Sequence, residues 1–450
     1  MKKRFEERVN ICFKPNDIRC VADLELDSEI CYKTGKALSE FLKVKYIIVG
    51  ADMRLSSKTL KKALIEGILD SGVNVIDIGL IDTPGLYFAS GYMNKCAAMI
   101  TASHNPAKYN GIKMTLKGAV PLNENNGLLE IRQKVLINEF KKFNIKGKII
   151  KKNILKDYKK HIRSFIKSKN LDVKIVVDAG NGMAGKLVPL VYTGLIREIY
   201  KLDFKLDGRF PNHEANPAKL KNIKDLREKV IETKADFGIA FDGDVDRVFF
   251  VDEQGRAIDS SLIACLLIKY FGKNKFVYNS VMSKIVPETI RNFGGKGYLE
   301  KVGHTFMKSR MKKVNAIFGC ENSAHYYYKD NYYADSGLIT SLIVCEIYNL
   351  AKKKGLKFSD LIKEFDKYYK INEKSFKVEN KKEVTSKIEK YYSSGKISKL
   401  DGLTVYFNDW WFNLRASNTE PLLRLNLEAD SKKLERLKLK GIVNLIKKFS

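Results

Sequence analysis

The chain lacks an apolar segment that is long enough to cross a bilayer. Its most apolar stretches, near residues 262–267 and 338–347, are far shorter than the roughly 20 residues that a spanning helix requires. The first seven residues are mostly charged and contain no apolar signal core. A membrane partner is therefore not expected, and we predict a cytoplasmic protein.

Cysteine is scarce and shows no pairing pattern. The seven cysteines are odd in number, are scattered along the chain, and form no Cys-x-x-Cys motif. This pattern supports neither a disulfide framework nor a zinc site.

Acidic residues are too few to balance the basic ones. The chain carries 82 Lys and Arg against 52 Asp and Glu, which gives a net charge of +30. Such a charge is compatible with nucleic-acid binding. However, the lysines are spread along the chain and form no compact patch, so we favour a solvated basic surface and expect no nucleic-acid partner. A basic anionic-polymer-binding protein without catalysis is the non-enzymatic alternative, and it would bind DNA or RNA with a steep salt dependence.

Three segments repeat the order strand, polar turn, helix. Apolar runs at residues 45–49, 174–177 and 275–278 predict strands, and helical spacing follows at 60–69 and 285–292. A chain of 450 residues is long enough for several domains, and this order predicts α/β domains. Candidate joints lie near residues 141–153, 252–255 and 365–372.

The last part of the chain has a different pattern. Residues 405–407 and 422–427 are strand-like, and residues 434–449 form a basic amphipathic helix. Such a helix can lie on a membrane surface, but we expect it to dock on the sheet of its own domain.

A serine lies on a stiff polar loop at residues 101–113. The apolar run 96–100 predicts a buried strand before it, Asn105-Pro106 breaks the chain, and Asn110-Gly111 predicts a tight turn before Lys113. The loop has no Gly-x-Ser-x-Gly motif, and Ser103 and His104 are sequence neighbours, which argues against a serine hydrolase. Ser103 can instead carry a phosphoryl group, which requires cations around it.

An acidic turn follows the apolar run 237–241. Asp242, Asp244 and Asp246 repel one another unless a cation lies among them, and their oxygen ligands suit Mg²⁺ or Ca²⁺. Arg247 stands where an EF-hand requires glycine, and residues 248–251 continue as a strand, so an EF-hand is excluded. A solvated acidic turn remains the alternative explanation.

Two further polar loops contain groups that suit a sugar phosphate. Residues 319–325 include carboxylate, hydroxyl and imidazole groups that can contact sugar hydroxyls or move a proton. Taken alone this is a weak signal, and an ordinary surface loop is the favoured explanation. Residues 415–421, together with Arg424, combine guanidinium and hydroxyl groups that suit a phosphate monoester. Four of the five histidines fall in polar loops, which leaves His161 as an ordinary surface histidine.

Taken together, these segments resemble the α-D-phosphohexomutase superfamily, in the same order and over nearly the whole chain. The matching segments are residues 12–19, 101–113, 178–185, 242–247, 301–304, 321–325 and 415–420. Thr101 and residues 417–419 look like phosphomannomutases and phosphoglucomutases, whereas phosphoglucosamine mutases tend to have serine at the first position and Ser-Gly-Thr at the second. Residues 323–330 are similar to the sugar loop of phosphomannomutases from surface-polysaccharide and GDP-mannose pathways.

The resemblance implies an α/β fold of four domains around a central cleft. Three related α/β/α domains with mixed sheets would span residues 1–147, 148–252 and 253–366, and would carry the phosphoserine, metal and sugar loops. A smaller C-terminal α+β (TBP-like) domain, residues 367–450, would bind phosphate. The implied protein is a monomer or weak dimer.

The implied activity interconverts mannose 6-phosphate and mannose 1-phosphate through a phosphoserine and a hexose 1,6-bisphosphate, with Mg²⁺ as cofactor. A phosphoglucomutase, a dual-specificity mutase and a phosphoglucosamine mutase are the alternatives. By resemblance, the catalytic residues are Ser103, His104, Lys113, His325, Arg19 and Arg247. The implied metal ligands are Ser103, Asp242, Asp244 and Asp246. The implied substrate-binding residues are Lys284, His304, Glu321, Ser323, Arg415, Ser417, Asn418, Thr419 and Arg424.

Two positions depart from the pattern of the superfamily. Asn16 replaces the usual tyrosine, and Cys20 replaces a glycine. Because glycine adopts backbone angles that other residues avoid, Cys20 raises the question of whether Arg19 keeps its place.

Overall fold

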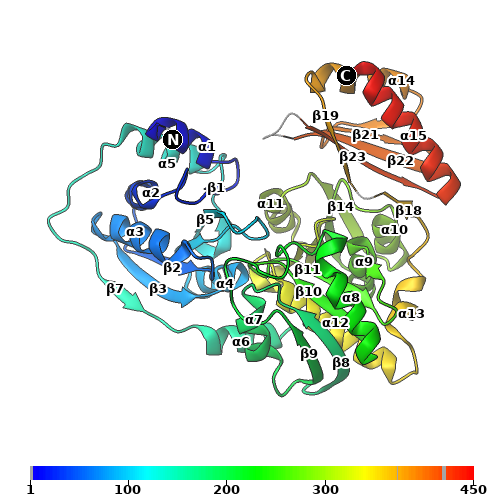
Figure 1. Cartoon of the computed structure of the whole chain (residues 1–450), viewed down its shortest axis with the longest axis horizontal. Helices are drawn as coiled ribbons and strands as arrows, with labels where there is room; N and C mark the ends of the chain where they lie inside the picture. Colours follow the sequence, from blue (N-terminus) through cyan, green and yellow to red (C-terminus); the bar gives the residue numbers. More distant parts are fainter. Residues whose placement is uncertain (1–3, 372, 418–421) are drawn as a thin grey trace. The chain divides into compact units, whose positions relative to one another are not determined.

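The structure is a computed structural model that describes residues 4–371, 373–417 and 422–450 (Figure 1). The chain divides into two compact units. Unit 1 contains residues 1–258 and 323–361, and unit 2 contains residues 259–322 and 362–450. The chain therefore enters unit 2, returns to unit 1, and enters unit 2 again.

Unit 1 begins with a mixed sheet in the order β1-β5-β4-β2-β3-β7, with β6 beside β5. The pairs β4–β2, β2–β3 and β3–β7 are parallel, whereas the pairs β1–β5 and β5–β4 are antiparallel. The strands are β1 (Ile18–Val21), β2 (Tyr46–Ala51), β3 (Asn74–Leu80), β4 (Cys96–Ile100), β5 (Tyr109–Leu116), β6 (Val120–Pro121) and β7 (Ile149–Lys151). The helices are α1 (Phe5–Cys12), α2 (Ser28–Leu42), α3 (Ser57–Leu69), α4 (Thr83–Met93) and α5 (Leu128–Ile137). The stretch 141–153, expected as a joint, thus contributes strand β7 to this sheet.

A second mixed sheet of unit 1 has the order β12-β11-β10-β8-β9. Its strands are β8 (Leu171–Asp178), β9 (Ile196–Leu202), β10 (Phe237–Phe241), β11 (Val248–Asp252) and β12 (Ala257–Ile258). Helices α6 (Leu155–Arg163), α7 (Ala184–Tyr192), α8 (Lys224–Thr233) and α12 (Gly337–Lys352) surround it. Every residue of β10 is buried, because α8 packs on this strand and its neighbours, and α12 packs on β8 and β11. The hairpin β16 (Tyr326–Tyr328) and β17 (Ala334–Asp335) also belongs to unit 1.

Unit 2 contains the parallel strands β14-β13-β15 and an antiparallel C-terminal sheet. The first group consists of β13 (Lys275–Asn279), β14 (Lys296–Glu300) and β15 (Phe318–Cys320), with α9 (Ser260–Phe271), α10 (Ile285–Asn292) and α11 (His304–Val314). Helix α10 has the bounds that the sequence predicts. Helix α13 (Phe358–Lys363) lies at the point where the chain enters unit 2 for the second time.

The C-terminal domain is a sheet with helices on one face (Figure 1). Its order is β18-β23-β22-β21-β20, with β19 beside β23, and every pair is antiparallel. The strands are β18 (Tyr369–Lys370), β19 (Lys374–Lys377), β20 (Lys396–Ser398), β21 (Leu403–Tyr406), β22 (Trp410–Ala416) and β23 (Leu422–Ala429), and the helices are α14 (Lys381–Tyr391) and α15 (Lys432–Phe449). Ile442 and Ile446 of α15 are buried in the core of this domain, which confirms that the basic amphipathic helix docks on its own sheet.

The expected fold class is confirmed: the sheets of unit 1 are mixed, and the last domain is α+β. The central cleft concerns the placement of the units relative to each other and stays a prediction. Among the helices that the structure describes, none has the length and hydropathy needed to traverse a membrane.

Two local expectations need correction. Asn110 and Gly111 form no turn, because both lie within β5. Gly111 is required by close packing, since a Cβ there would lie 2.1 Å from the carbonyl oxygen of Ile18. Cys20 lies in β1, opposite Asn110, where any residue adopts the extended backbone, so its replacement of glycine introduces no strain.

Helices α2 and α3 cross at Gly35 and Gly67. Because the two backbones lie so close, one added methyl group should reduce stability strongly. A Cβ at Gly67 would lie 2.0 Å from the carbonyl oxygen of Tyr32. We expect Gly67→Ala to lower the free energy of unfolding by about 2 kcal/mol, because backbone must move. Gly441→Ala in α15 is the matched control: its nearest neighbour lies 3.7 Å away, and it should gain about 0.5–1 kcal/mol. Urea unfolding measures both, and equal stability of the two variants would contradict the close crossing.

Candidate active site

The loop after β4 holds Ser103 in an uncommon backbone conformation. Ser103 has a φ of 51°, a left-handed value that costs free energy in residues other than glycine. Its backbone N–H donates to Thr101 Oγ1 at 3.0 Å, and its side chain is buried. Such strain persists only where surrounding contacts hold it.

Arg54 supplies those contacts. Its two terminal nitrogens donate to the carbonyl oxygens of Ser103 (2.7 Å), Asn105 (2.6 Å), Pro106 (2.9 Å) and Tyr109 (2.9 Å). The guanidinium is fully buried, and Arg54 lies in the turn three residues after the end of β2. A planar group with five donors suits a loop whose carbonyl oxygens converge on one point. Arg54 therefore fixes the shape of the loop and places a positive charge beneath it.

The three predicted metal ligands meet at the end of β10, next to the serine. Asp242, Asp244 and Asp246 are all buried and lie close enough to hold one metal ion. Ser103 Oγ donates to Asp242 Oδ2 at 2.8 Å. The backbones also touch, because a Cβ on Gly243 would lie 2.6 Å from the carbonyl oxygen of Ser103. The structure thus brings the serine and the acidic loop together as one site.

The electrostatics of this carboxylate group call for positive charge. Burial raises the pKa of Asp242 well above its ordinary value, and the charges of Asp246 and Asp244 raise it further. Within the described residues, Oδ1 of Asp244 and Oδ1 of Asp246 are buried and accept no hydrogen bond. Buried acceptors without a donor are costly, and hard oxygen ligands suit a divalent cation. The donor set therefore fits a metal ion.

Lys113 of β5 supplies part of the balancing charge. Its ammonium donates to Asp244 Oδ2 at 3.0 Å and to Asp246 Oδ2 at 2.7 Å. Burial alone would lower the pKa of Lys113, but the two carboxylates outweigh it and raise the pKa well above the ordinary value. Lys113 is consequently protonated at neutral pH and can give up a proton rather than accept one.

His325 lies beside the same loop in a defined tautomer. Arg247 Nε donates to His325 Nε2 at 2.9 Å, so that nitrogen carries a lone pair. His325 Nδ1 lies 2.6 Å from Asp335 Oδ2, which assigns the proton to Nδ1. An antiparallel bridge between Arg247 and His325 holds the two segments together. Nε2 is thus the ring nitrogen that accepts from Arg247.

Arg19 and His104 complete the group around Ser103. Arg19 contacts Asn105 Oδ1 at 3.2 Å and is held by Asp17 at 2.6 Å. His104 Nδ1 lies 3.2 Å from Ser103 Oγ. Burial, reinforced by the charges of Arg247 and Arg19, keeps the pKa of His104 well below its ordinary value. His104 is therefore neutral, and Arg19 is the charged partner of the loop.

The predicted sugar-binding residues divide between the units. Ser323, like His325, belongs to unit 1, whereas Glu321, His304 and Lys284 belong to unit 2. Within unit 2, Glu321 Oε2 accepts from Asn279 Nδ2 (3.2 Å) and from the backbone N–H of Gly303 (2.9 Å), and His304 begins α11 next to that glycine.

Lys284 is engaged within unit 2 by groups of the protein itself. It forms an ion pair with Asp430, and its ammonium lies 4.1 Å from the ring centre of Tyr368. Its predicted contact with substrate, like those of the other sugar-binding residues, stays a prediction.

The predicted phosphate-binding residues gather in the C-terminal domain. Arg415 and Arg424 are direct cross-strand partners in β22 and β23. Ser417 follows β22, and its carbonyl oxygen accepts from Lys381 Nζ at 2.8 Å. Asn418 and Thr419 lie outside the described residues.

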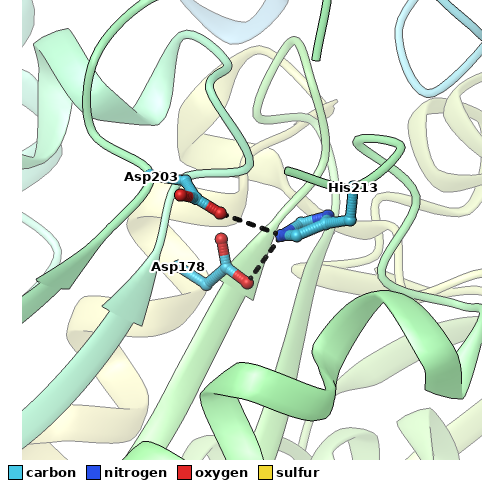
Figure 2. Close-up of side chains that lie close together, drawn as sticks. All are labelled: Asp178, Asp203 and His213. Carbon is cyan, nitrogen blue, oxygen red and sulfur yellow. Dashed lines mark hydrogen bonds and ion pairs between the residues drawn. The ribbon is translucent and has the colours of Figure 1, made fainter. Parts of the chain in front are cut away.

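A further group of charged side chains lies at the ends of β8 and β9 (Figure 2). His213 Nε2 lies 3.1 Å from Asp178 Oδ2 and 3.3 Å from Asp203 Oδ2, and His213 Nδ1 lies 2.9 Å from the carbonyl oxygen of Glu214. Because all three partners accept, both ring nitrogens carry protons. Burial lowers the pKa of His213, but the bonds and charges outweigh it and raise the pKa to about 9. An imidazolium thus neutralises this group.

The His213 segment supports the acidic loop from below. A Cβ on Gly243 would meet the side chain of Ala215 at 3.5 Å, and a Cβ on Gly180 would meet His213 at 3.4 Å. The backbone N–H of Met183 donates to the carbonyl oxygen of Gly243 at 3.0 Å. The ion group of His213 therefore lies one layer behind the metal loop.

Sequence reasoning missed Arg54, Asp335 and Thr83, whose hydroxyl donates to Asp244 Oδ2 at 2.5 Å. Arg54 had a signal, since it ends a polar turn after a buried strand, but nothing in the sequence pairs it with the serine loop. The expectation for His161 was wrong: its ring lies 4.8 Å from the ring of Phe88 and bonds Asn331 Oδ1 at 2.9 Å. It is half-buried because it packs against aromatic side chains.

This site is suited to phosphoryl transfer, a reaction whose catalysis consists mainly of positioning and charge neutralisation. It combines a serine hydroxyl that donates to a buried group of three carboxylates with arginine, lysine and a neutral histidine around them. Domain models of the phosphoglucomutase/phosphomannomutase family match the chain in four places. They are α/β/α domain I at residues 10–142, α/β/α domain II at 156–255, α/β/α domain III at 259–368 and the C-terminal domain at 373–440. The chain belongs to this family and is a phosphohexomutase.

Similar proteins and a similar solved structure match over nearly the whole chain. A phosphomannomutase of Vibrio cholerae serotype O1 is 39% identical, with 97% of this chain and 98% of that protein covered. A phosphomannomutase of Methanocaldococcus jannaschii is 36% identical, with the same coverage. The crystal structure of a phosphoglucomutase/phosphomannomutase family protein from Burkholderia thailandensis is similar with a TM-score of 0.88 at 28% identity, covering 99% of this chain and 98% of that one.

The contacts of Arg54 predict a coupled loss of stability and activity. Arg54→Met leaves four loop carbonyl oxygens without their donor, so we expect the free energy of unfolding to fall by about 3 kcal/mol and turnover to fall with it. Arg54→Lys, with a single ammonium, should recover only part of both. Arg209→Met, at an exposed arginine, is the control. Full activity of Arg54→Met would refute the role of Arg54 in shaping the loop.

The His213 group predicts a pH dependence of stability. The folded pKa of about 9 exceeds the ordinary value near 6.5, so the stabilisation is complete below about pH 6.5 and is lost as the pH rises through 9. We expect about 2 kcal/mol, after allowance for solvent screening. Unfolding measured from pH 6 to 10 should show this loss in the unchanged protein and a flatter curve for His213→Gln. Parallel curves would contradict the imidazolium assignment.

Proposed function

We propose that this phosphohexomutase interconverts mannose 6-phosphate and mannose 1-phosphate through a phosphorylated Ser103 and a hexose 1,6-bisphosphate, and serves the synthesis of GDP-mannose and surface polysaccharide. The observation that carries the proposal is the 2.8 Å hydrogen bond between Ser103 Oγ and Asp242 Oδ2, which joins the phosphate carrier to the acidic loop. The preference for mannose is supported by relatives named phosphomannomutase at 36–39% identity.

In the first half-reaction, the bond between phosphorus and Ser103 Oγ breaks while a sugar hydroxyl oxygen forms a new bond to phosphorus. The hydroxyl proton passes to His325 Nε2. The lone pair of this nitrogen accepts from Arg247 in the structure and becomes free when Arg247 turns to the phosphate. Lys113, protonated beside Asp246, can return a proton to Ser103 Oγ. The bisphosphate then presents its other phosphate, and the same steps run in reverse.

The positive side chains oppose the charge that spreads over the phosphoryl group during transfer. Arg19 and Arg247 supply guanidinium charge, and neutral His104 is placed to bond Ser103 or its phosphate. Mg²⁺, held by Asp242, Asp244, Asp246 and an oxygen on Ser103, would supply further neutralisation of the transferring group.

Substrate recognition is assigned, by resemblance, to residues of the sugar loop and of the C-terminal domain. Glu321 and Ser323 would bind sugar hydroxyls. By resemblance, His304 and Lys284 would also contact the substrate. Arg415, Ser417 and Arg424 would bind the phosphate that does not react, together with the residues at 418 and 419.

The remaining expectations also belong to this proposal. The domain boundaries 1–147, 148–252, 253–366 and 367–450 are supported by the four family matches. A monomer or weak dimer, the absence of a nucleic-acid partner and a cytoplasmic location stay predictions.

Substitution of Ser103 tests the mechanism. Ser103→Ala removes the only oxygen to which the phosphoryl group is proposed to attach, so we expect no detectable turnover in a coupled assay and no added phosphate by intact mass. Ser164→Ala, at an exposed serine of the same unit, should keep both.

The assay includes Mg²⁺, hexose 1,6-bisphosphate, and the phosphates of mannose, glucose and glucosamine. Faster turnover of mannose phosphates supports the proposed substrate, and faster turnover of glucose or glucosamine phosphates overturns that preference. Turnover by Ser103→Ala equal to that of the unchanged protein would exclude the phosphoserine mechanism.

A further inference from the structure

The C-terminal sheet has an apolar face and a polar face, and the two arginines of the proposed phosphate site lie on the polar one. Along β23, Leu423, Leu425 and Leu427 are buried in the domain core. Side chains alternate along a strand, so Arg424 projects from the opposite face. Arg415 is its direct cross-strand partner and shares that face. We call Arg415 and Arg424 the arginine pair.

Two like charges placed directly opposite each other on a sheet are destabilising. Glu373, which comes just before β19, lies between them. Its Oε2 is 3.5 Å from Arg415 Nη2, and its Oε1 is 3.6 Å from Arg424 Nη1. Asn426 Nδ2 donates to Glu373 Oε2 at 3.1 Å. One carboxylate therefore bridges both guanidinium groups, as the oxygens of a phosphate would.

A second carboxylate near the pair has a different, fixed role. Asp401 Oδ2 lies 3.6 Å from Arg415 Nη1, but it also accepts from Ser280 Oγ at 2.8 Å and from the backbone N–H of Val302 at 3.0 Å. These bonds tie Asp401 in place, whatever binds to Arg415. Among the described residues, Glu373 forms ion pairs of 3.5 and 3.6 Å and accepts one amide hydrogen bond, and its side chain is 31% exposed. Glu373 can thus turn into solvent, whereas Asp401 cannot.

The charges decide what such a movement does. The charges of these four described side chains, Arg415, Arg424, Glu373 and Asp401, sum to zero. When Glu373 leaves, the remaining three sum to +1 and face a phosphate monoester, which carries nearly two negative charges at neutral pH. Resting on the proposed function of the arginine pair, we infer that Glu373 is an internal competitor of the substrate phosphate, which occupies the pair when the site is empty and must be displaced on binding.

This competition sets the strength of phosphate binding. A solvent-exposed carboxylate–guanidinium contact contributes modestly, so displacing it weakens the hold on phosphate about 3- to 10-fold. A weakened hold suits an enzyme whose bisphosphate leaves the pair and returns with its other end. Glu373 is thus a specificity-determining residue: it excludes weak anions while a phosphate dianion still binds.

Binding of mannose 6-phosphate tests the inference without turnover. Isothermal titration is performed with the full chain carrying Ser103→Ala, at constant salt, alone and combined with further substitutions. Glu373→Gln keeps the shape and the amide contact but removes the charge, and should tighten the dissociation constant about 3- to 10-fold. Glu373→Asp, which is too short to bridge the pair, should tighten it less. Glu379→Gln removes an exposed carboxylate of the same domain, and should leave it unchanged.

Arg415→Gln separates the inference from the proposed function. If Arg415→Gln weakens binding and Glu373→Gln tightens it, Glu373 is the competitor. If Arg415→Gln weakens binding while Glu373→Gln weakens it too or has no effect, the competition is wrong and the phosphate role of the pair stands. If Arg415→Gln has no effect, both are wrong. If Glu379→Gln tightens binding as much as Glu373→Gln does, the effect is due to the net charge of the protein and the inference is overturned. Thermal unfolding of each variant checks that it is folded.

Discussion

Three carboxylates buried at the end of one strand are the constraint on which the site of unit 1 depends. Asp242, Asp244 and Asp246 are placed there by a strand that is buried along its whole length, and burial makes their mutual repulsion strong. Positive or proton-donating groups therefore surround them: Lys113 from one sheet, the Ser103 hydroxyl from the loop beside it, and Arg247 from the loop itself. The same demand for charge makes the loop suitable for a metal ion and for a phosphoryl group.

In three places of the structure, a side chain of opposite charge lies between side chains of like charge. A lysine lies among the carboxylates of the metal loop, an imidazolium lies between Asp178 and Asp203, and a carboxylate lies between Arg415 and Arg424. The three differ in exposure. The buried lysine and the largely buried imidazolium are held by several bonds, whereas Glu373 is partly exposed and loosely held. Permanent structure and exchangeable contact are thus distinguished by how much water reaches the ion.

Much of this was predictable from the sequence, for physical reasons. Strands β4 and β10 are short, fully buried apolar runs bounded by polar turns, and helix α10 has clear amphipathic spacing, so local pattern specifies them. The serine and the three aspartates follow such strands directly. Arg54, Asp335 and Glu373 could not be found in this way, because their roles arise from contacts with residues 49, 10 and 42 positions away. The Asn110-Gly111 turn failed for the complementary reason, since tertiary packing against β1 overrides a local turn signal.

Helix α12 gives the order of synthesis a consequence for folding. The strands of the second sheet and the acidic loop are complete by residue 252, yet the helix that covers β8 and β11 spans residues 337–352 and is made only after residues 259–322 of unit 2. A ribosome-bound chain that has reached residue 320 therefore lacks the helix that covers this sheet. A break in the chain at any single point between residues 258 and 337 would separate that helix from its sheet. The part of unit 1 that carries the site therefore cannot be produced complete as one continuous N-terminal fragment that ends where unit 2 begins.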